Sequence, residues 1–592
     1  MNSKLILLSM SIFLSTSLIP LSYAETVPSW VKNTAGWWAT DAISETEFVN
    51  AIEFLVQTNL IHLEKDYSSL DTSLLLTWNQ IVNDAVYANN GSLEIRDHYF
   101  QNSDIMLTTK FDSNKDTYLD HSTYDLLNSG LALYRITGSE LYLDQARYVA
   151  NNIEDYFILE DGRVAVYSPI TKQYLLGHNQ EVLQDVANLA LIDRTYVDLT
   201  KILADRIIQY EINSETNLLY NDFNNDGTPK NSAMYMSYRG AVGLESLMLA
   251  YEVTEDKKYL EKVKKTLLTY WSIRNSDTNL IPGSVNTTDL SPDKEFMQQY
   301  GAGIFLKLLL HYYYLTDDPE ILIIMNTYAD AVIKNFWDGH TWNYRVNYDG
   351  SILSPVVEGN YAKLDNSLIL LDEVNLFKSN FTDFAKKDYD NSFQKKLSVV
   401  NDLIIHSVKD DGTKDSPQSM MQYGFIINQN IGIKLFQLTN DPKYLSSLNE
   451  FYHSIIKNHK RELGYIYGID AYTLEDTPLG YILNQRATSM IANKINLSFA
   501  PVGDVKILWT KIGNHELSEP FISTFDDSGR FNLIHFNYNE NSIIFEKIQN
   551  SGKIIFSNEI DSVFVNGLPY ENFELYTLNT LNGSNQYKII LK

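Results

Sequence analysis

The stretch Thr254-Glu255-Asp256-Lys257-Lys258-Tyr259-Leu260 lies between two apolar runs that have helical spacing. Related stretches begin at Thr137, Thr316 and Thr439. The four copies are separated by close to one or two units of about 60 residues, and a fixed period of this kind indicates a repeat architecture. Degenerate copies near residues 195 and 377 complete a series of six turns. The sequence therefore predicts six helical hairpins.

The two helices of each predicted hairpin differ in character. The run before each turn is apolar on most of its faces, as in Gly303–Phe305 and the leucines that follow, whereas the run after it is amphipathic, as in 257–268. A helix that is apolar all round is buried, and an amphipathic helix lies at a surface. Small residues such as Gly240 and Gly243 occur early in the first helices and allow close approach. We predict an (α/α)6 toroid, mainly α, with the first helix of each hairpin inside the ring.

The two ends of this ring are expected to differ. The turns inside the hairpins are short, whereas the connections between hairpins are long, and loops beyond about 12 residues are usually functional or disordered. These connections contain hairpin signals, for example Tyr348-Asp349-Gly350. We therefore expect ordered loops around a cleft at the end where the inner helices begin. The long connections cover approximately residues 158–179, 212–232, 274–296, 338–360 and 408–419.

The sequence predicts four regions. Residues 1–24 resemble a secretory signal peptide, with Lys4 before an apolar run and Ala24 at the cleavage position. Residues 25–66 form a small Trp-rich module, residues 67–498 form the toroid, and residues 499–592 form a β-sandwich-like domain of short strands. The N-terminal module resembles one found in exported archaeal proteins. We expect a secreted or cell-surface protein without an integral membrane segment after signal cleavage.

Charge and composition restrict the partners and cofactors. The net charge is −27, which disfavours nucleic acid as a partner. The chain has no cysteine, and its histidines and carboxylates do not show zinc-ligand spacing, so we expect no zinc site. We also expect no nucleotide cofactor.

Candidate site residues lie just before the inner helices or near their first turns. Paired carboxylates can act as acid and base or nucleophile in sugar chemistry, and aromatic rings stack on sugars. The catalytic candidates are Asp125, Asp185, Glu295 and Asp365. The substrate-binding candidates are Tyr238, Arg239, Trp342, Tyr344, Tyr423 and Arg486. The alternative is structural, because a carboxylate at a helix N-terminus is stabilised there and a repeated tyrosine can be a packing residue.

Two segments have the alternating oxygen donors of calcium loops. The first has Asp112, Asn114, Asp116 and Asp120, and the second has Asp222, Asn224 and Asp226 before Gly227. Such loops can wrap a structural Ca²⁺ ion, although neither has the glutamate that completes an EF-hand. The alternative is a polar turn held by its own side chains.

The six copies of apolar helix, Thr-containing turn and amphipathic helix resemble the six-hairpin glycosidase-like superfamily over about residues 120–495. The resemblance implies a carbohydrate-active enzyme with a carbohydrate as substrate or ligand. A glycoside hydrolase is the first hypothesis. A uronate polysaccharide lyase or sugar epimerase on the same fold is an alternative, and so is a non-catalytic glycan-binding surface protein. A shared fold alone does not choose among these activities.

Overall fold

A computed structural model describes the structure of the chain. It describes residues 140–154, 179–221, 239–354, 362–373, 380–391, 468–475, 551–556, 558–583 and 585–592, with shorter segments between 86 and 548. The chain divides into two units, Met1–Lys65 and Asp66–Lys592, and the first lies wholly outside the described residues. The signal peptide and the Trp-rich module therefore stay predictions. In the part of the chain that is described, no helix is both long and apolar enough to cross a bilayer.

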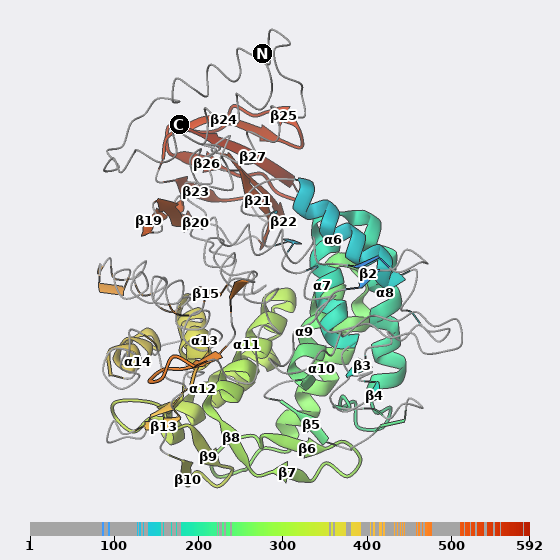
Figure 1. Ribbon diagram of the computed structural model, residues 1–592, viewed down its shortest axis with the longest axis vertical. Helices are drawn as coiled ribbons and strands as arrows, with labels where there is room; N and C mark the ends of the chain where they lie inside the picture. The colour runs from blue at the N-terminus through green and yellow to red at the C-terminus, as the bar shows by residue number, and fades with distance from the viewer. Residues whose placement is uncertain are drawn as a thin grey trace, which may run out of the picture. The chain divides into compact units, whose positions relative to one another are not determined.

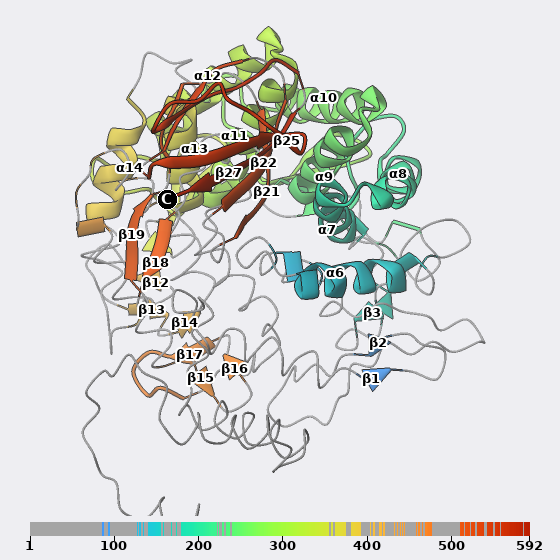
Figure 2. The same ribbon diagram turned by 90° about the horizontal axis from the view of Figure 1, so that it is seen from above.

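Consecutive helices of the second unit pair as hairpins (Figure 1). Figure 2 shows α8, α10, α12 and α14 on the outside of an arc that α7, α9, α11 and α13 form. The arc is part of the (α/α)6 toroid, with the first helix of each hairpin inside, as the sequence predicts. The helices are α6 Glu140–Asn152, α7 Asn179–Ile192, α8 Val197–Arg206, α9 Arg239–Thr254, α10 Lys257–Ser272, α11 Gln299–Thr316, α12 Pro319–Phe336, α13 Ala362–Glu373 and α14 Thr382–Asp388.

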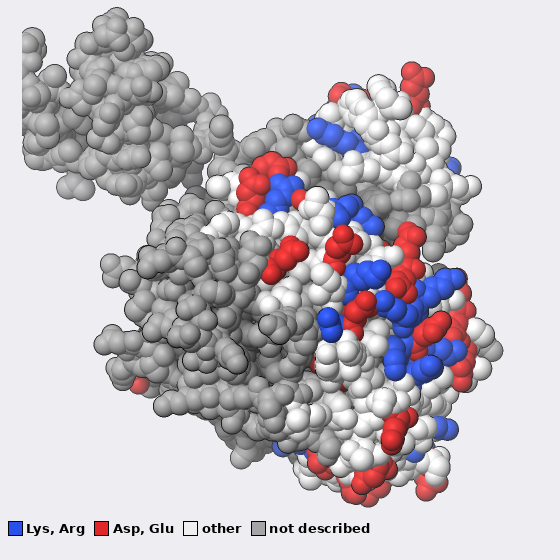
Figure 3. Space-filling view, turned by 90° about the vertical axis from the view of Figure 1, so that its right-hand side faces the viewer, with Lys and Arg blue, Asp and Glu red and all other residues white. Residues whose placement is uncertain are grey.

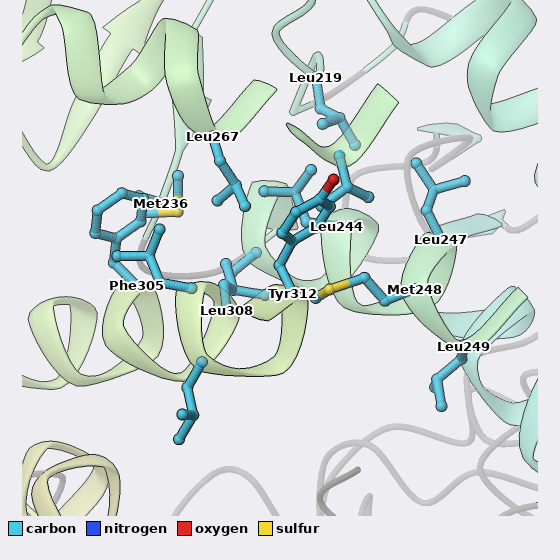
Figure 4. Close-up of a cluster of buried hydrophobic side chains, with 14 of the residues drawn as sticks. Leu219, Met236, Leu244, Leu247, Met248, Leu249, Leu267, Phe305, Leu308 and Tyr312 are labelled. Carbon is cyan, nitrogen blue, oxygen red and sulfur yellow. The ribbon is translucent and has the colours of Figure 1, made fainter. Parts of the chain in front are cut away.

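The core fills the space between inner and outer helices (Figure 4). Leu244 of the inner helix α9, Leu267 of the outer helix α10 and Phe305 of the inner helix α11 belong to it, and all three are almost completely buried. The expected role of small residues is visible at Gly243, where an added Cβ would lie 2.3 Å from the Leu219 side chain and 2.8 Å from that of Gln180 on α7. Glycine at this position therefore lets α9 pack closely against the preceding hairpin.

The repeated turn is built by two local hydrogen-bond caps. The hydroxyl of Thr254 donates to the Ala250 carbonyl at the end of α9, and Asp256 accepts the backbone N–H of Lys258 as the N-cap of α10. Between them, Glu255 has a φ of 59°. The copies at Thr316 and Thr439 repeat both bonds. The motif ends one helix and starts the next because the threonine bonds back to its own helix, while the aspartate satisfies a backbone N–H that the following helix itself leaves unpaired.

The tyrosine of the turn joins one hairpin to the previous one. Tyr259 is buried, and its hydroxyl donates to the Asp205 carboxylate of α8 at 2.8 Å. Tyr196 bonds Asn151 in the same way at 2.9 Å, and its hairpin has Asp193 as N-cap. Asp193 and Tyr196 therefore correspond to Asp256 and Tyr259 of the turn at Thr254. The turn of this copy lies a few residues before Thr195, where the sequence placed its start. Through this tyrosine, each turn contacts the outer helix of the preceding hairpin.

Most of the C-terminal strands form two antiparallel sheets around their own core, as expected from the short β runs, and β18 and β19 pair separately. The sheets have the strand orders β21-β22-β27-β24-β25 and β20-β23-β26. Ile543, Ile554, Val563, Leu578 and Ile589 come from both sheets and are buried together. The bounds are β18 Thr510–Gly513, β19 Glu516–Pro520, β20 Ile522–Asp526, β21 Arg530–Asn537, β22 Ser542–Ile548, β23 Lys553–Phe556, β24 Ile560–Val565, β25 Leu568–Pro569, β26 Thr577–Asn579 and β27 Asn585–Leu591.

Candidate functional site

The long connections between hairpins are joined to one another by short antiparallel strand pairs. Strand β5, before α9, pairs with β6, before α11; β8, also before α11, pairs with β9, before α13. The same pattern continues where β11 pairs with β12 and β14 pairs with β17. Each pair joins two successive connections at the end where the inner helices begin, and Figure 1 shows β5 to β10 gathered there. We call this set of strand pairs the strand girdle.

The strands in these connections have only two or three residues each. Within the girdle they are β5 Ala233–Tyr235, β6 Ser284–Asn286, β7 Pro292–Lys294, β8 Phe296–Gln298, β9 Arg345–Asn347, β10 Ile352–Ser354, β11 Val357–Glu358, β12 Ser407–Val408, β13 Lys414–Ser416, β14 Gln418–Met420 and β17 Gly468–Asp470. Further two-residue strands are β1 Val86–Tyr87, β2 Leu93–Glu94, β3 Tyr167–Ser168, β4 Gln173–Tyr174, β15 Lys460–Arg461 and β16 Gly464–Tyr465.

The sheet β10-β9-β8 has one buried face and one polar face. Met297 and Val346 lie opposite each other in register and are 1% and 0% exposed. Because side chains alternate along a strand, their neighbours Gln298 and Arg345, also opposite each other, point to the other face. Both are half-buried. The alternation therefore presents an amide and a guanidinium beside the first turn of α11.

A chain of hydrogen bonds organises this polar face. The Tyr300 hydroxyl donates to Oε1 of Gln298 at 2.6 Å, and the Gln298 amide donates to the Tyr344 hydroxyl, also at 2.6 Å. The Arg345 guanidinium lies 4.7 Å from the Tyr344 ring centroid and 5.4 Å from that of Phe296. Tyr344, a predicted substrate-binding residue, is thus held between an amide and a cation.

The sheet β5-β6-β7 adjoins the sheet β10-β9-β8 through a close backbone approach. An added Cβ on Gly283 would lie 2.3 Å from the carbonyl oxygen of Phe296, so only glycine fits between the two sheets. On this second sheet, the Lys294 ammonium lies 4.5 Å from the ring centroid of Tyr235. The strand girdle therefore has two cations seated on aromatic rings.

Among the catalytic candidates in the described residues, Glu295 is the exposed one. It lies between β7 and β8, and its carbonyl accepts the backbone N–H of Tyr348. Asp185 is on the second turn of α7 and is 6% exposed. The structure therefore leaves the Glu295 side chain accessible from solvent.

Asp365 has a different environment, buried inside its hairpin. Its Oδ1 accepts the indole N–H of Trp342 at 2.7 Å, and its carboxyl makes a hydrogen bond with that of Asp388. Burial, and next the nearby charge of Asp388, raise the pKa of Asp365 well above its ordinary value. No N–H or O–H donor among the described residues reaches Asp365 Oδ2, and we infer that the two carboxyls share a proton there. In this position Asp365 supports the fold and is inaccessible to a sugar.

Trp342 is also a core residue in the structure. It is 2% exposed, and its ring packs against Trp337 at 4.7 Å and Phe384 at 6.0 Å between centroids. Its backbone N–H donates to Asp388. The ring has no exposed face on which a sugar can stack, so the stacking role predicted for Trp342 is replaced by packing of the 338–343 segment against α14.

Two polar pairs between inner helices were not among the sequence candidates. Lys307 of α11 lies 2.7 Å from the Glu245 carboxylate of α9, and His311 lies 2.9 Å from Glu252. Lys307 and Glu245 are 22% and 15% exposed, whereas His311 is nearly fully buried. The sequence does contain a signal for these pairs, namely a polar or charged residue inside each apolar helix. Such a residue is costly to bury without a partner, so its presence predicts one.

The remaining candidates lie outside the described residues: Asp125, Tyr238, Tyr423, Arg486 and the calcium-loop residues Asp112, Asn114, Asp116, Asp120, Asp222, Asn224 and Asp226. Arg239 is the first residue of α9, and only its backbone is described. The described part of the chain contains no group of three or more histidines and carboxylates arranged to hold a metal. Calcium binding therefore stays a prediction.

The outer helices have a charged surface of a different kind. A groove of about 290 Å³ between α8 and α10 is lined by Asp205, Ile208, Lys258, Glu261, Lys262 and Lys265. Lys258 pairs there with Asp205 at 2.6 Å, and Figure 3 shows both charge signs mixed on this face. Exposed pairs of this sort contribute little to stability and typically mark a solvated surface.

Comparisons with known proteins support the fold. No protein-family model matches the chain, and no curated protein sequence matches it. Among solved structures, an alpha-1,2-mannosidase from Trichoderma reesei is 14% identical with a TM-score of 0.52, covering 76% of this chain and 97% of its own. A cellobiose 2-epimerase from Spirochaeta thermophila is 12% identical with a TM-score of 0.48, covering 64% and 98%. At these identities the likeness concerns the fold alone, and the chain has the (α/α)6 toroid fold.

Proposed function

We propose that this protein is an exported carbohydrate-active enzyme, a glycoside hydrolase that cleaves an oligo- or polysaccharide by acid/base catalysis. The observation that carries the proposal is the strand girdle, which gathers an exposed carboxylate, Glu295, and the hydrogen-bonded Gln298, Tyr300 and Tyr344 on the paired connections that lead into α11 and α13. A carboxyl group, an amide and phenols suit a sugar because they combine proton transfer with hydroxyl recognition. Glu295 is the proposed acid or base, and Asp185 is the proposed second carboxylate.

A Glu295→Gln substitution tests the catalytic assignment. It removes the proton-transferring carboxyl and keeps the shape, so we expect turnover to fall by about 100-fold or more, the usual contribution of general acid–base catalysis. Binding should change less than about threefold. The assay incubates the mature chain with a panel of neutral and acidic oligosaccharides and follows products by NMR. Repeating it with EDTA, and then with added CaCl₂, tests the calcium loops.

Glu261→Gln is the matched control, because Glu261 is an exposed glutamate on the outer helix α10. It should leave turnover unchanged. Full turnover by Glu295→Gln would refute the assignment of Glu295. Glycan binding without turnover in the wild type would favour the non-catalytic alternative, and an unsaturated product would favour a lyase.

A sugar epimerase is the second candidate, and the Glu245–Lys307 pair favours it. A carboxylate and an ammonium at 2.7 Å, both partly exposed, can accept and return a proton within an inner-helix seam. The same NMR assay separates the two activities, because epimerisation inverts one carbon without releasing a new reducing end. Loss of epimerisation in Lys307→Met, with hydrolysis absent in the wild type, would support this candidate.

Export follows from the N-terminal sequence and is proposed on that basis alone. Cleavage after Ala24 would leave Glu25 as the first residue. We expect N-terminal sequencing of the protein recovered from the medium or cell surface of its source to begin at Glu25. Recovery of the intact N-terminus from the cytoplasmic fraction would contradict export.

A further inference from the structure

We propose that Arg345 forms an anion-binding subsite for an acidic saccharide, with the carboxylate of a uronate residue as the preferred group. This inference rests on the proposed function, since it names the substrate class of the same site. It begins with the position of Arg345. The residue opens β9 opposite Gln298, on the polar face of its sheet, and beside the first turn of α11.

The guanidinium of Arg345 is held in place by aromatic rings. It stacks on Tyr344 and Phe296, and its long contact to the Tyr344 hydroxyl is 3.5 Å. No carboxylate among the described residues pairs with it, and its Nε is buried without an acceptor. A guanidinium has five N–H donors in a fixed planar fork, so most of its donors await an acceptor. Planar carboxylates match that fork with two parallel hydrogen bonds.

Other cations of the described chain show the contrast. Arg147 contacts Asp193, Asp144 and Glu140 at 2.7, 2.8 and 3.2 Å. Lys264 contacts Asp318 and Glu320. These residues hold one hairpin against the next, so their charges are neutralised inside the protein. Arg345 is oriented by two rings and the Tyr344 hydroxyl, none of which is charged, and this leaves its charge available to a ligand.

The surroundings of Arg345 suit a sugar that has an acidic group. Gln298, Tyr300 and Tyr344 form the hydrogen-bonded chain described above, and such groups recognise sugar hydroxyls. Lys294 adds a second cation on the adjoining sheet. Asp293 and Glu295 are exposed carboxylates on the same connection, and Asp293 accepts the Ser284 hydroxyl at 2.6 Å. With a net charge of −27, the protein repels an acidic chain elsewhere, so a local cation is needed to bind one.

The test measures binding by calorimetry with the full mature chain. The probes are a galacturonate trimer, a hyaluronan tetrasaccharide, a sulfated tetrasaccharide and, as neutral sugars, mannotriose and cellotriose. We expect the acidic probes to bind more tightly, with an affinity that falls as NaCl rises from 20 to 200 mM. Arg345→Gln should weaken acidic probes by about tenfold or more and neutral probes by less than twofold. Arg345→Lys should lie between, because it keeps the charge and loses the fork.

Arg206→Gln is the matched control, since Arg206 also lies over a tyrosine ring, Tyr210, but on the outer helix α8. It should leave all affinities unchanged, and thermal unfolding should show that Arg345→Gln is folded. Binding of the sulfated probe alone, lost in Arg345→Gln, would identify sulfate as the anion. Binding of neutral but not acidic probes, or equal acidic binding by Arg345→Gln, would overturn the subsite and leave the proposed function intact. Binding of no sugar at all would overturn both.

Discussion

Replacing Asp365 with alanine is expected to destabilise the protein by about 2–6 kcal/mol in total, because it leaves two buried polar groups without their partner at about 1–3 kcal/mol each. The Trp342 indole N–H would lose its acceptor, and Asp388 would lose the carboxyl with which it bonds. Asp365→Asn, in contrast, should keep the protein folded with little loss of stability near neutral pH. The amide oxygen can accept from Trp342 while the amide N–H donates to Asp388, so the network is kept without a titrating proton.

The sign of the pH dependence follows from the raised pKa of Asp365. The folded protein holds a proton on this group at a pH where the unfolded chain has released it. The stability from this proton is complete below the ordinary aspartate pKa and is lost as the pH rises through the raised folded pKa. Across that window the slope approaches about 1.4 kcal/mol per pH unit for one proton. Asp365→Asn should remove this slope and be more stable than the wild type at alkaline pH.

Tryptophan fluorescence during thermal unfolding, recorded from pH 5 to 9, measures the effect close to Trp342. Asp330→Asn serves as the control, because Asp330 is an exposed aspartate on the neighbouring helix α12. It should keep the wild-type slope. If Asp365→Asn also keeps the wild-type slope, the pH dependence comes from other groups and the shared proton is excluded.

Replacing Glu211 with alanine is the second large expected effect. Glu211 is 1% exposed at the end of the π-helix η5, Ile207–Glu211, and its two carboxylate oxygens accept the side-chain amides of Asn179 and Gln180 at 2.8 and 2.9 Å. These bonds tie the last turn of an outer helix to the first turn of the inner helix α7. Alanine would strip two buried amides of their acceptors, at a cost of about 2–4 kcal/mol in total.

The measurement is the apparent melting temperature of the full chain, together with limited proteolysis around residues 207–221. Glu215→Ala, an exposed glutamate four residues later, is the control and should be nearly neutral. Glu211→Gln should fall between the two, since it keeps one acceptor oxygen and presents an N–H to the other amide. A wild-type melting temperature in Glu211→Ala would show that water replaces the carboxylate and that its hydrogen bonds with Asn179 and Gln180 are not needed for stability.

Much of the fold could be predicted from the sequence because its signals are local. Thr254 and Asp256 form caps with backbone groups within four residues, and the copies at Thr316 and Thr439 do the same. The spacing of these copies then gives the hairpin repeat, and the length difference between connections identifies the end where strands such as β8 and β9 pair. The Asp-Gly turn at 349–350 was readable for the same reason, and Gly350 has a φ of 89°.

What only the tertiary structure decided is how each carboxylate is used. Asp365 and Glu295 both lie near the start of an inner helix, and the local sequence does not separate them. The fold places Asp365 beside Trp342 and Asp388, so it becomes a buried proton-sharing group, while Glu295 stays exposed. Likewise, Glu245 and Lys307 meet only because α9 and α11 are neighbours, and Arg345 reaches the Phe296 ring only because β9 pairs with β8. Burial and partners depend on contacts between distant residues, and a periodic pattern does not contain them.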